Sequence, residues 1–176
     1  MSKAIWLMII MLLLVFSAEI FASEVKLNNM ENDYPILMIA NRTQDAEKYD
    51  VTVNVNKGDK VAFRIYIHNT VANTEAINTK VYLRCVQDAN CLKTYKVSAK
   101  ADNSNEISSV AQIYSDKPFQ LEYIPGTTQK IYFDNGNMKN TIIPDGIVEA
   151  IDGYLIGNLK GCWEYVNYVI FQFNVK

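Results

Sequence analysis

The chain has 176 residues, of which 49% are hydrophobic and 20% charged, and its formal net charge is −2. This length and composition are sufficient for one globular domain with its own core. Because the charges nearly balance, no basic field is present to attract nucleic acid or anionic lipid. We therefore expect no nucleic-acid partner, and no membrane partner except through an uncleaved leader.

The first 22 residues have the layout of a secretory signal peptide. Lys3 is a short positive region, residues 4–16 are an unbroken apolar run, and Ala22 is a small residue suited to precede a cleavage point. The run is shorter than the roughly 20 apolar residues of a membrane span. Ile20 stands where a small residue is usual, so an uncleaved anchor is the alternative. The sequence predicts a signal helix at 1–22 and a secreted or cell-surface, extracytoplasmic location.

Residues 23–33 are mostly polar, and we expect them to form a flexible lead-in. From about residue 34 onward, apolar and polar residues alternate with turn residues between, as is typical of strands. The clearest strand is 60–68, where Val61, Phe63 and Ile65 share one face. Arg64 and Tyr66 fall on the other face. The alternation predicts one buried face and one wetter face.

Similar patterns predict strands at 51–55, 76–86, 95–101, 108–114, 119–124, 129–133 and 165–175. We expect residues 56–59 to form a hairpin between the strands at 51–55 and 60–68. The stretch 140–160 is predicted to be a long connection with one short strand at 154–156. Many short strands at this spacing predict an all-β fold for residues 34–176, an immunoglobulin-like β-sandwich, with a closed barrel as the alternative.

Export affects the interpretation of the three cysteines, Cys85, Cys91 and Cys162. In an oxidising compartment two of them can pair. We favour a Cys85–Cys91 disulfide, because the intervening VQDAN segment is polar and long enough to reverse direction. The alternatives are a Cys85–Cys162 bridge and three reduced, buried thiols. The chain has no C-x-x-C pair, so a zinc site and thioredoxin-like chemistry are not expected.

His68 is the single histidine of the chain. A catalytic histidine needs a nucleophile and an orienting acid, and no spacing in the sequence indicates such a set. We favour a structural role, in which His68 and Asn69 end a strand and their side chains hydrogen-bond a nearby loop. The sequence predicts no catalytic residues, no cofactor and no histidine-based metal site.

Two clusters of Asp and Asn could supply oxygen ligands to calcium. They are Asp102, Asn103 and Asn105, and Asp134, Asn135 and Asn137. Neither contains the full ligand series of a calcium loop. We favour turns in which these side chains satisfy local backbone groups, and calcium binding is the alternative.

Tyrosine is in surplus, with eleven residues. Tyr66 and Tyr82 fall out of phase with the apolar residues of their strands, and Trp163 lies in a separate Gly-Cys-Trp segment. These three are the candidate surface aromatics for binding sugar or protein. In the alternative interpretation a loop covers the second face of the sheet, and the rings contribute to packing.

Three segments stand out in chain order: the strand end Tyr66-Ile67-His68-Asn69, the turn Tyr123-Ile124-Pro125-Gly126, and Ile156-Gly157 followed by Gly161-Cys162-Trp163-Glu164-Tyr165. Taken together, they resemble an uncharacterised family of exported bacterial surface domains. The resemblance covers roughly residues 35–176. It implies an immunoglobulin-like sandwich in the envelope or outside the cell, with no known catalytic residues.

Export, the strand pattern and this resemblance predict a non-enzymatic secreted or envelope module for adhesion, assembly or structural support. Its expected partner is a protein or a cell-wall polymer, and self-assembly through a free sheet edge is a further possibility. One alternative is a carbohydrate-binding sandwich that uses exposed aromatics. A second alternative is a secreted hydrolase with paired carboxylates.

Overall fold

The computed structural model describes residues 24–134 and 136–176. The signal helix predicted for residues 1–22 and the predicted turn residue Asn135 lie outside the described residues. Within those two ranges, no helix has the length and apolar composition needed to cross a membrane.

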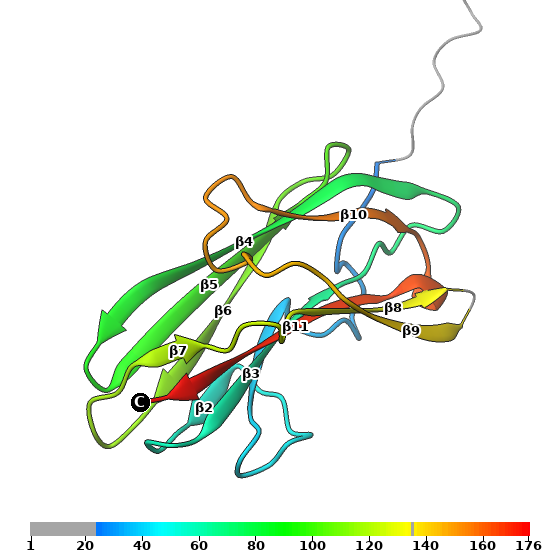
Figure 1. The fold of residues 1–176 in the computed structure, drawn as a ribbon. Coiled ribbons are helices and arrows are strands. Elements are labelled where there is room, and N and C mark those ends of the chain that lie inside the picture. Colours follow the sequence, from blue (N-terminus) through cyan, green and yellow to red (C-terminus); the bar gives the residue numbers. More distant parts are fainter. Residues whose placement is uncertain (1–23, 135) are drawn as a thin grey trace, which may run out of the picture.

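Two β-sheets form the described part of the chain (Figure 1). The six-stranded sheet has the order β1 (Leu37–Asn41), β3 (Lys60–Ile67), β11 (Asn167–Val175), β8 (Gln129–Asp134) and β9 (Asn137–Ile142), and β7 (Leu121–Tyr123) also pairs with β11. The five-stranded sheet has the order β10 (Tyr154–Lys160), β4 (Glu75–Ala89), β5 (Leu92–Lys100), β6 (Ile107–Tyr114) and β2 (Thr52–Asn54). A 3-10 turn, η1 (Trp163–Tyr165), lies between β10 and β11. The predicted all-β, two-sheet architecture is confirmed.

The core lies between the sheets and follows the predicted alternation. Phe63 of β3 and Phe171 of β11 are both 0% exposed and stack with ring centroids 5.4 Å apart. From the opposite sheet, Tyr95 of β5 meets Phe63 edge-on at 4.9 Å. Each buried aromatic side chain of this kind contributes roughly 1.5–3 kcal/mol through removal of apolar surface from water.

The hairpin predicted at residues 56–59 is wrong, because β2 and β3 belong to different sheets. β2 pairs in parallel with β6, whereas β3 pairs with β1 and β11. The crossing is held by the Asp59 carboxylate, whose Oδ2 accepts hydrogen bonds from Asn56 N at 2.9 Å and Asn41 Nδ2 at 2.7 Å. These hydrogen bonds stabilise the connection through which the chain passes from one sheet to the other.

The flexible lead-in predicted at 23–33 is also wrong for the described residues 24–33. Val25 and Leu27 are 1% and 3% exposed and belong to the core. Asn28 N donates to His68 O at 2.8 Å, and Asn28 Oδ1 accepts from His68 N at 2.9 Å. Apolar burial and the Asn28 hydrogen bonds therefore attach this segment to the end of β3.

The predicted long connection at 140–160 contains more strand than expected. β10 extends to Lys160, and residues 140–142 belong to β9, which forms a hairpin with β8. All six residues of β9 are exposed. Because neither face of β9 is buried, its sequence has no apolar alternation that would predict a strand.

The predicted Cys85–Cys91 disulfide does not form, and all three cysteines are free thiols. The VQDAN segment continues β4 instead of forming a loop. Cys85 lies opposite Tyr95 in the β4–β5 ladder, whereas Cys91 is in the turn that follows Ala89. The extended strand from Cys85 to Ala89 spans about 13 Å, and Cys91 lies in the turn beyond Ala89. A disulfide requires Cα atoms within about 7 Å, so Cys85 and Cys91 are too far apart to pair.

Candidate functional site

The outer face of the six-stranded sheet carries the side chains that alternate with the core. In the β3–β11 ladder, Arg64 lies opposite Ile170 and Tyr66 lies opposite Tyr168. Ala62 and Gln172 form the next pair along the ladder. Since Phe63 and Phe171 point into the core, these neighbours necessarily point away from it.

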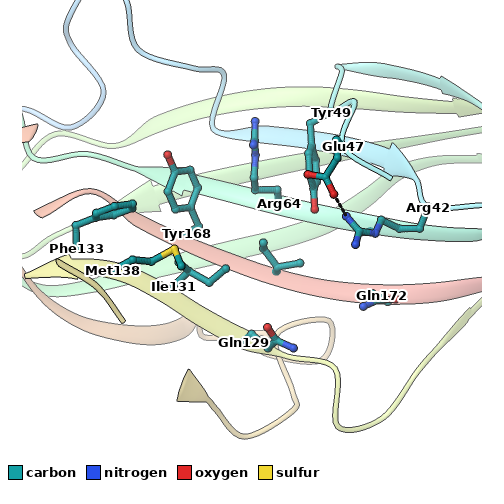
Figure 2. A pocket seen from close by; sticks show the side chains of 12 residues that line it. Arg42, Glu47, Tyr49, Arg64, Gln129, Ile131, Phe133, Met138, Tyr168 and Gln172 are labelled. Carbon is teal, nitrogen blue, oxygen red and sulfur yellow. Dashed lines mark ion pairs between the residues drawn. The ribbon is translucent and has the colours of Figure 1, made fainter. Parts of the chain in front are cut away.

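A groove of about 430 Å³ runs across this face (Figure 2). Its floor is formed by β3 and β11. One wall is the β1–β2 loop, with Arg42, Glu47 and Tyr49, and the other is the β8–β9 hairpin. The hairpin contributes Gln129, Ile131, Phe133 and Met138. The volume lies within the range of roughly 300–1,000 Å³ found for small-ligand sites.

Arg64 stands at the centre of the groove among tyrosine rings (Figure 2). Its Cζ lies 4.2 Å from the ring centroid of Tyr49 and 5.6 Å from that of Tyr168. Tyr34, from the segment before β1, contributes a third ring at 5.4 Å. Such cation–π contacts are worth about 0.5–2 kcal/mol each and orient the guanidinium.

The rim of the groove carries one ion pair, between Arg42 and Glu47. Arg42 Nη1 lies 3.9 Å from Glu47 Oε1 and also donates to the carbonyl of Ala46. The Glu47 side chain is 91% exposed, so this pair stabilises the fold by at most about 1 kcal/mol. Both groups are therefore available to a ligand.

The two tyrosines beside Arg64 keep their hydroxyl protons at neutral pH. Burial raises the pKa of Tyr49 above its usual value, and the cations Arg42 and Arg64 oppose this only in part. Burial likewise raises the pKa of Tyr168. Each hydroxyl can thus donate and accept hydrogen bonds while its ring contacts apolar surface.

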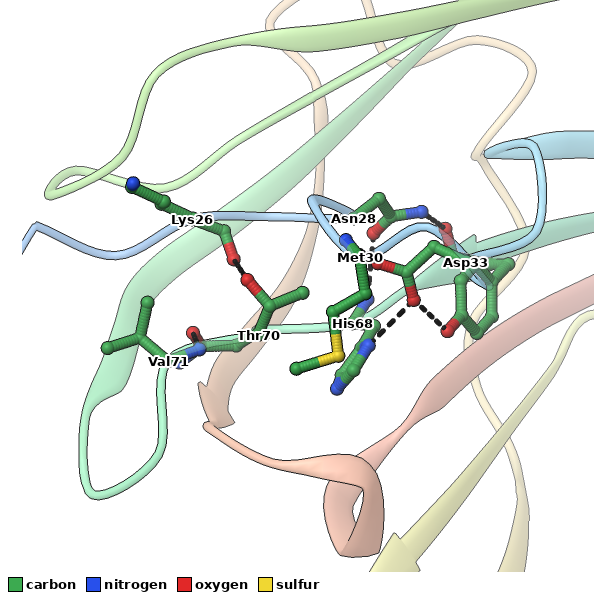
Figure 3. Close-up of polar contacts among 9 residues, drawn as sticks. Lys26, Asn28, Met30, Asp33, His68, Thr70 and Val71 are labelled. Carbon is green, nitrogen blue, oxygen red and sulfur yellow. Dashed lines mark hydrogen bonds and ion pairs between the residues drawn. The ribbon is translucent and has the colours of Figure 1, made fainter.

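A second polar cluster lies further along the same face, at the end of β3 (Figure 3). Asp33 Oδ1 accepts from Tyr66 Oη at 2.6 Å and lies 2.7 Å from His68 Nδ1. Asp33 Oδ2 accepts from Met30 N at 2.8 Å. Although burial alone would raise it, the pKa of Asp33 is lowered by these hydrogen bonds. Burial and the Asp33 carboxylate raise the pKa of Tyr66.

His68 is a buried residue of this cluster that connects β3 to neighbouring segments. Its side chain is 0% exposed, and the Trp163 ring of η1 packs against its ring, with centroids 4.3 Å apart and an interplanar angle of 37°. Its Nε2 atom has no hydrogen-bond partner among the described residues. Asn69 Nδ2 donates to Leu159 O at 3.1 Å. The predicted hydrogen bonds from His68 and Asn69 to neighbouring segments are confirmed.

The three predicted surface aromatics do not form one binding row. Tyr66 is 1% exposed, so its prediction as a surface-binding residue is wrong. Tyr34 covers its ring edge-on at 5.5 Å, and Asp33 holds its hydroxyl. Trp163 is 45% exposed, but one side of its ring packs against His68. Tyr82 lies on the other sheet, half-buried, with its ring only 2.6 Å from the position a Cβ on Gly153 would take.

The Asp102 cluster uses its side chains to tie loops together. Asp102 Oδ2 accepts from Asn78 Nδ2 at 2.8 Å, and Asn103 Oδ1 accepts from Ile77 N at 3.0 Å. Asn105 Nδ2 donates to Glu24 Oε1 at 2.8 Å. In the described part of the chain, no group of three or more His, Cys, Asp or Glu side chains could hold a metal ion.

The sequence pattern predicts only some of the residues that line the groove. Alternation along β3 correctly placed Arg64 on the face away from the core. Tyr49 and Arg42 lie in an irregular polar loop, and Met138 in a strand without alternation, so no periodic signal indicated that they converge.

Comparison with known proteins returned no matching family model, curated protein or solved structure.

Proposed function

We propose that this chain is a non-enzymatic binding module of the cell surface, and that its groove binds a carbohydrate polymer of the cell wall. In this proposal the chain is exported by its signal peptide, and its sandwich is of the immunoglobulin-like type. The observation that carries the proposal is the mixed lining of the groove, where aromatic rings stand beside planar polar side chains.

This lining suits a sugar better than a purely apolar ligand. A pyranose has an apolar C–H face and a rim of hydroxyls. Tyr168 and Phe133 supply rings for the face, and Gln129 and Gln172 supply amides that both donate and accept hydrogen bonds. An apolar ligand would cover these amides without offering them hydrogen bonds in place of water.

The number of carboxylates in the groove favours binding over hydrolysis. A glycosidase requires two acidic groups about 5–9.5 Å apart across the scissile bond. Among the described residues that line the groove, Glu47 is the single acid, and it pairs with Arg42. This arrangement supports adhesion or assembly on a polymer without its cleavage.

The proposal is tested by measuring binding of the purified protein to a panel of cell-wall oligosaccharides by isothermal titration calorimetry. We expect Tyr168→Ala to weaken binding at least tenfold and Tyr168→Phe to retain most of it, because the ring is kept. Tyr82→Ala is the matched control on the opposite sheet and should change affinity less than twofold. Absence of binding to every saccharide, or equal losses in Tyr168→Ala and Tyr82→Ala, would overturn the proposal.

A further inference from the structure

We infer that the groove is selective for a negatively charged saccharide, with Arg64 as the residue that binds its acidic group. This inference rests on the proposed carbohydrate binding and names the class of sugar. It follows from the charge balance of the groove, the hydrogen-bonding capacity of Arg64 and the position of Arg64 on the sheet.

Among the described residues that line the groove, one cation has no counter-ion. Arg42 and Glu47 neutralise one another at the rim. Arg64 makes no ion pair with any of the described residues. Half-buried arginines normally face a carboxylate, because removing a cation from water without compensation is costly. The whole chain carries a net charge of −2, so this positive centre is a local feature.

The guanidinium also retains most of its donor capacity. Arginine has five N–H donors in a planar fork. Within the described residues, the acceptor that Arg64 contacts is the thioether of Met38, 3.2 Å from Nη2. Nε also has no partner, but it is buried, so the donors open to a ligand are those of the two Nη groups. Sulfur is a weak acceptor. A ligand oxyanion would therefore replace little and satisfy donors that the protein itself leaves open.

The tyrosines around Arg64 prepare it for this role. Tyr49 and Tyr168 compensate the cation through their ring faces, which stabilises the arginine without a fixed counter-ion. Ring stacking uses the flat face of the guanidinium, whereas carboxylates bind along its edge. Ala62, small and next to Arg64 along β3, leaves room for a ligand above the sheet.

The group that fits best is the carboxylate of a uronic acid. It is planar and can accept two parallel hydrogen bonds from one guanidinium. A sulfate ester on a neutral sugar presents similar oxygens, and the two sources are distinguished by experiment.

The test compares galacturonan oligomers with their fully methyl-esterified form, which has the same sugar backbone without the charge. We expect the purified protein to bind the acid at least tenfold more tightly, with a preference that weakens as NaCl rises from 50 to 300 mM. Arg64→Gln should remove the preference while binding of the methyl ester persists. Arg84→Gln, an exposed arginine on the five-stranded sheet, is the matched control and should keep the preference.

The outcomes separate this inference from the proposed function. Equal binding of the acid and its methyl ester would overturn the charge selectivity and leave carbohydrate binding intact. Binding of neither form, when neutral saccharides of the panel do bind, would also overturn it. Binding of sulfated galactan as tightly as galacturonan would support the anionic site and show that it accepts sulfate as well as carboxylate groups. If Arg64→Gln does not fold, the comparison of the two polymers on the unmodified protein still decides.

Discussion

His68 Nδ1 lies 2.7 Å from Asp33 Oδ1, and these two side chains are only 0% and 3% exposed. The contact joins the end of β3 to the segment that precedes β1. Because the same carboxylate oxygen also accepts from Tyr66, a single acid secures two side chains of the outer face. It thereby holds the segment before β1 over this part of the outer face, beside the groove.

Removal of the Asp33 carboxylate should destabilise the protein strongly. Asp33→Ala would leave the Tyr66 hydroxyl and the His68 ring buried without their acceptor, and a buried polar group left without its partner costs about 1–3 kcal/mol. We expect a decrease of this size in the free energy of unfolding measured with urea. Asp116→Ala, at an exposed position, is the control and should change it by less than about 0.5 kcal/mol. A similar small change for Asp33→Ala would show that the cluster does not hold the segment.

The same carboxylate should make stability depend on acid pH. The pKa of Asp33 is lowered from 3.8 in the folded chain, so the unfolded chain binds more protons between the two values. The Asp33 contribution is present above the unfolded pKa and is lost as pH falls through the folded pKa. Hydrogen bonds from Lys176 and Tyr123 also lower the pKa of Glu122 and Asp145, respectively. The difference in unfolding free energy between wild type and Asp33→Asn therefore isolates Asp33, and it should shrink from pH 7 to pH 3. A difference independent of pH would contradict this assignment.

Gly161 should not tolerate even one added methyl group. A Cβ there would lie 1.8 Å from the carbonyl oxygen of Val71, which is backbone and cannot rotate away. Gly161→Ala is therefore expected to displace the β10–η1 connection and to cost at least about 1–3 kcal/mol, the usual range for overpacking. Thermal denaturation followed by circular dichroism measures the loss. Ser108→Ala, at an exposed position on β6, serves as a mild substitution for comparison. An unchanged melting temperature for Gly161→Ala would mean that the backbones are further apart than the structure places them.

All three cysteines should react as thiols. After unfolding without reductant, alkylation with iodoacetamide should add three carbamidomethyl groups to the intact mass, since the three residues are free. In the folded protein at pH 8, Cys91 should react faster than Cys85. Burial, with a contribution from Asp88, raises the pKa of the Cys85 thiol, and the thiolate is the reactive form. A single added group would instead indicate a disulfide.

Periodicity along the chain predicted most of the strands that form the core, but not β1, in which Leu37 and Ile39 are 0% exposed. β3 and β11 have strict alternation, and alternation is a local property of an extended chain with one buried face. The two-sheet class followed from the number and spacing of such strands. β9 could not be predicted in this way, because none of its residues is buried and no apolar pattern distinguishes it from a loop.

The sequence alone determined that Arg64 and Tyr66 would lie on the same face of β3, away from the core. Only the tertiary structure decided that Tyr66 is buried and that Arg64 faces a groove. The segment around Asp33 buries Tyr66, whereas the β1–β2 loop and the β8–β9 hairpin leave Arg64 open in a groove between them. The physical reason is that side-chain direction depends on backbone geometry within a strand. Coverage depends on which distant segments fold over that strand, and those contacts have no local pattern in the sequence.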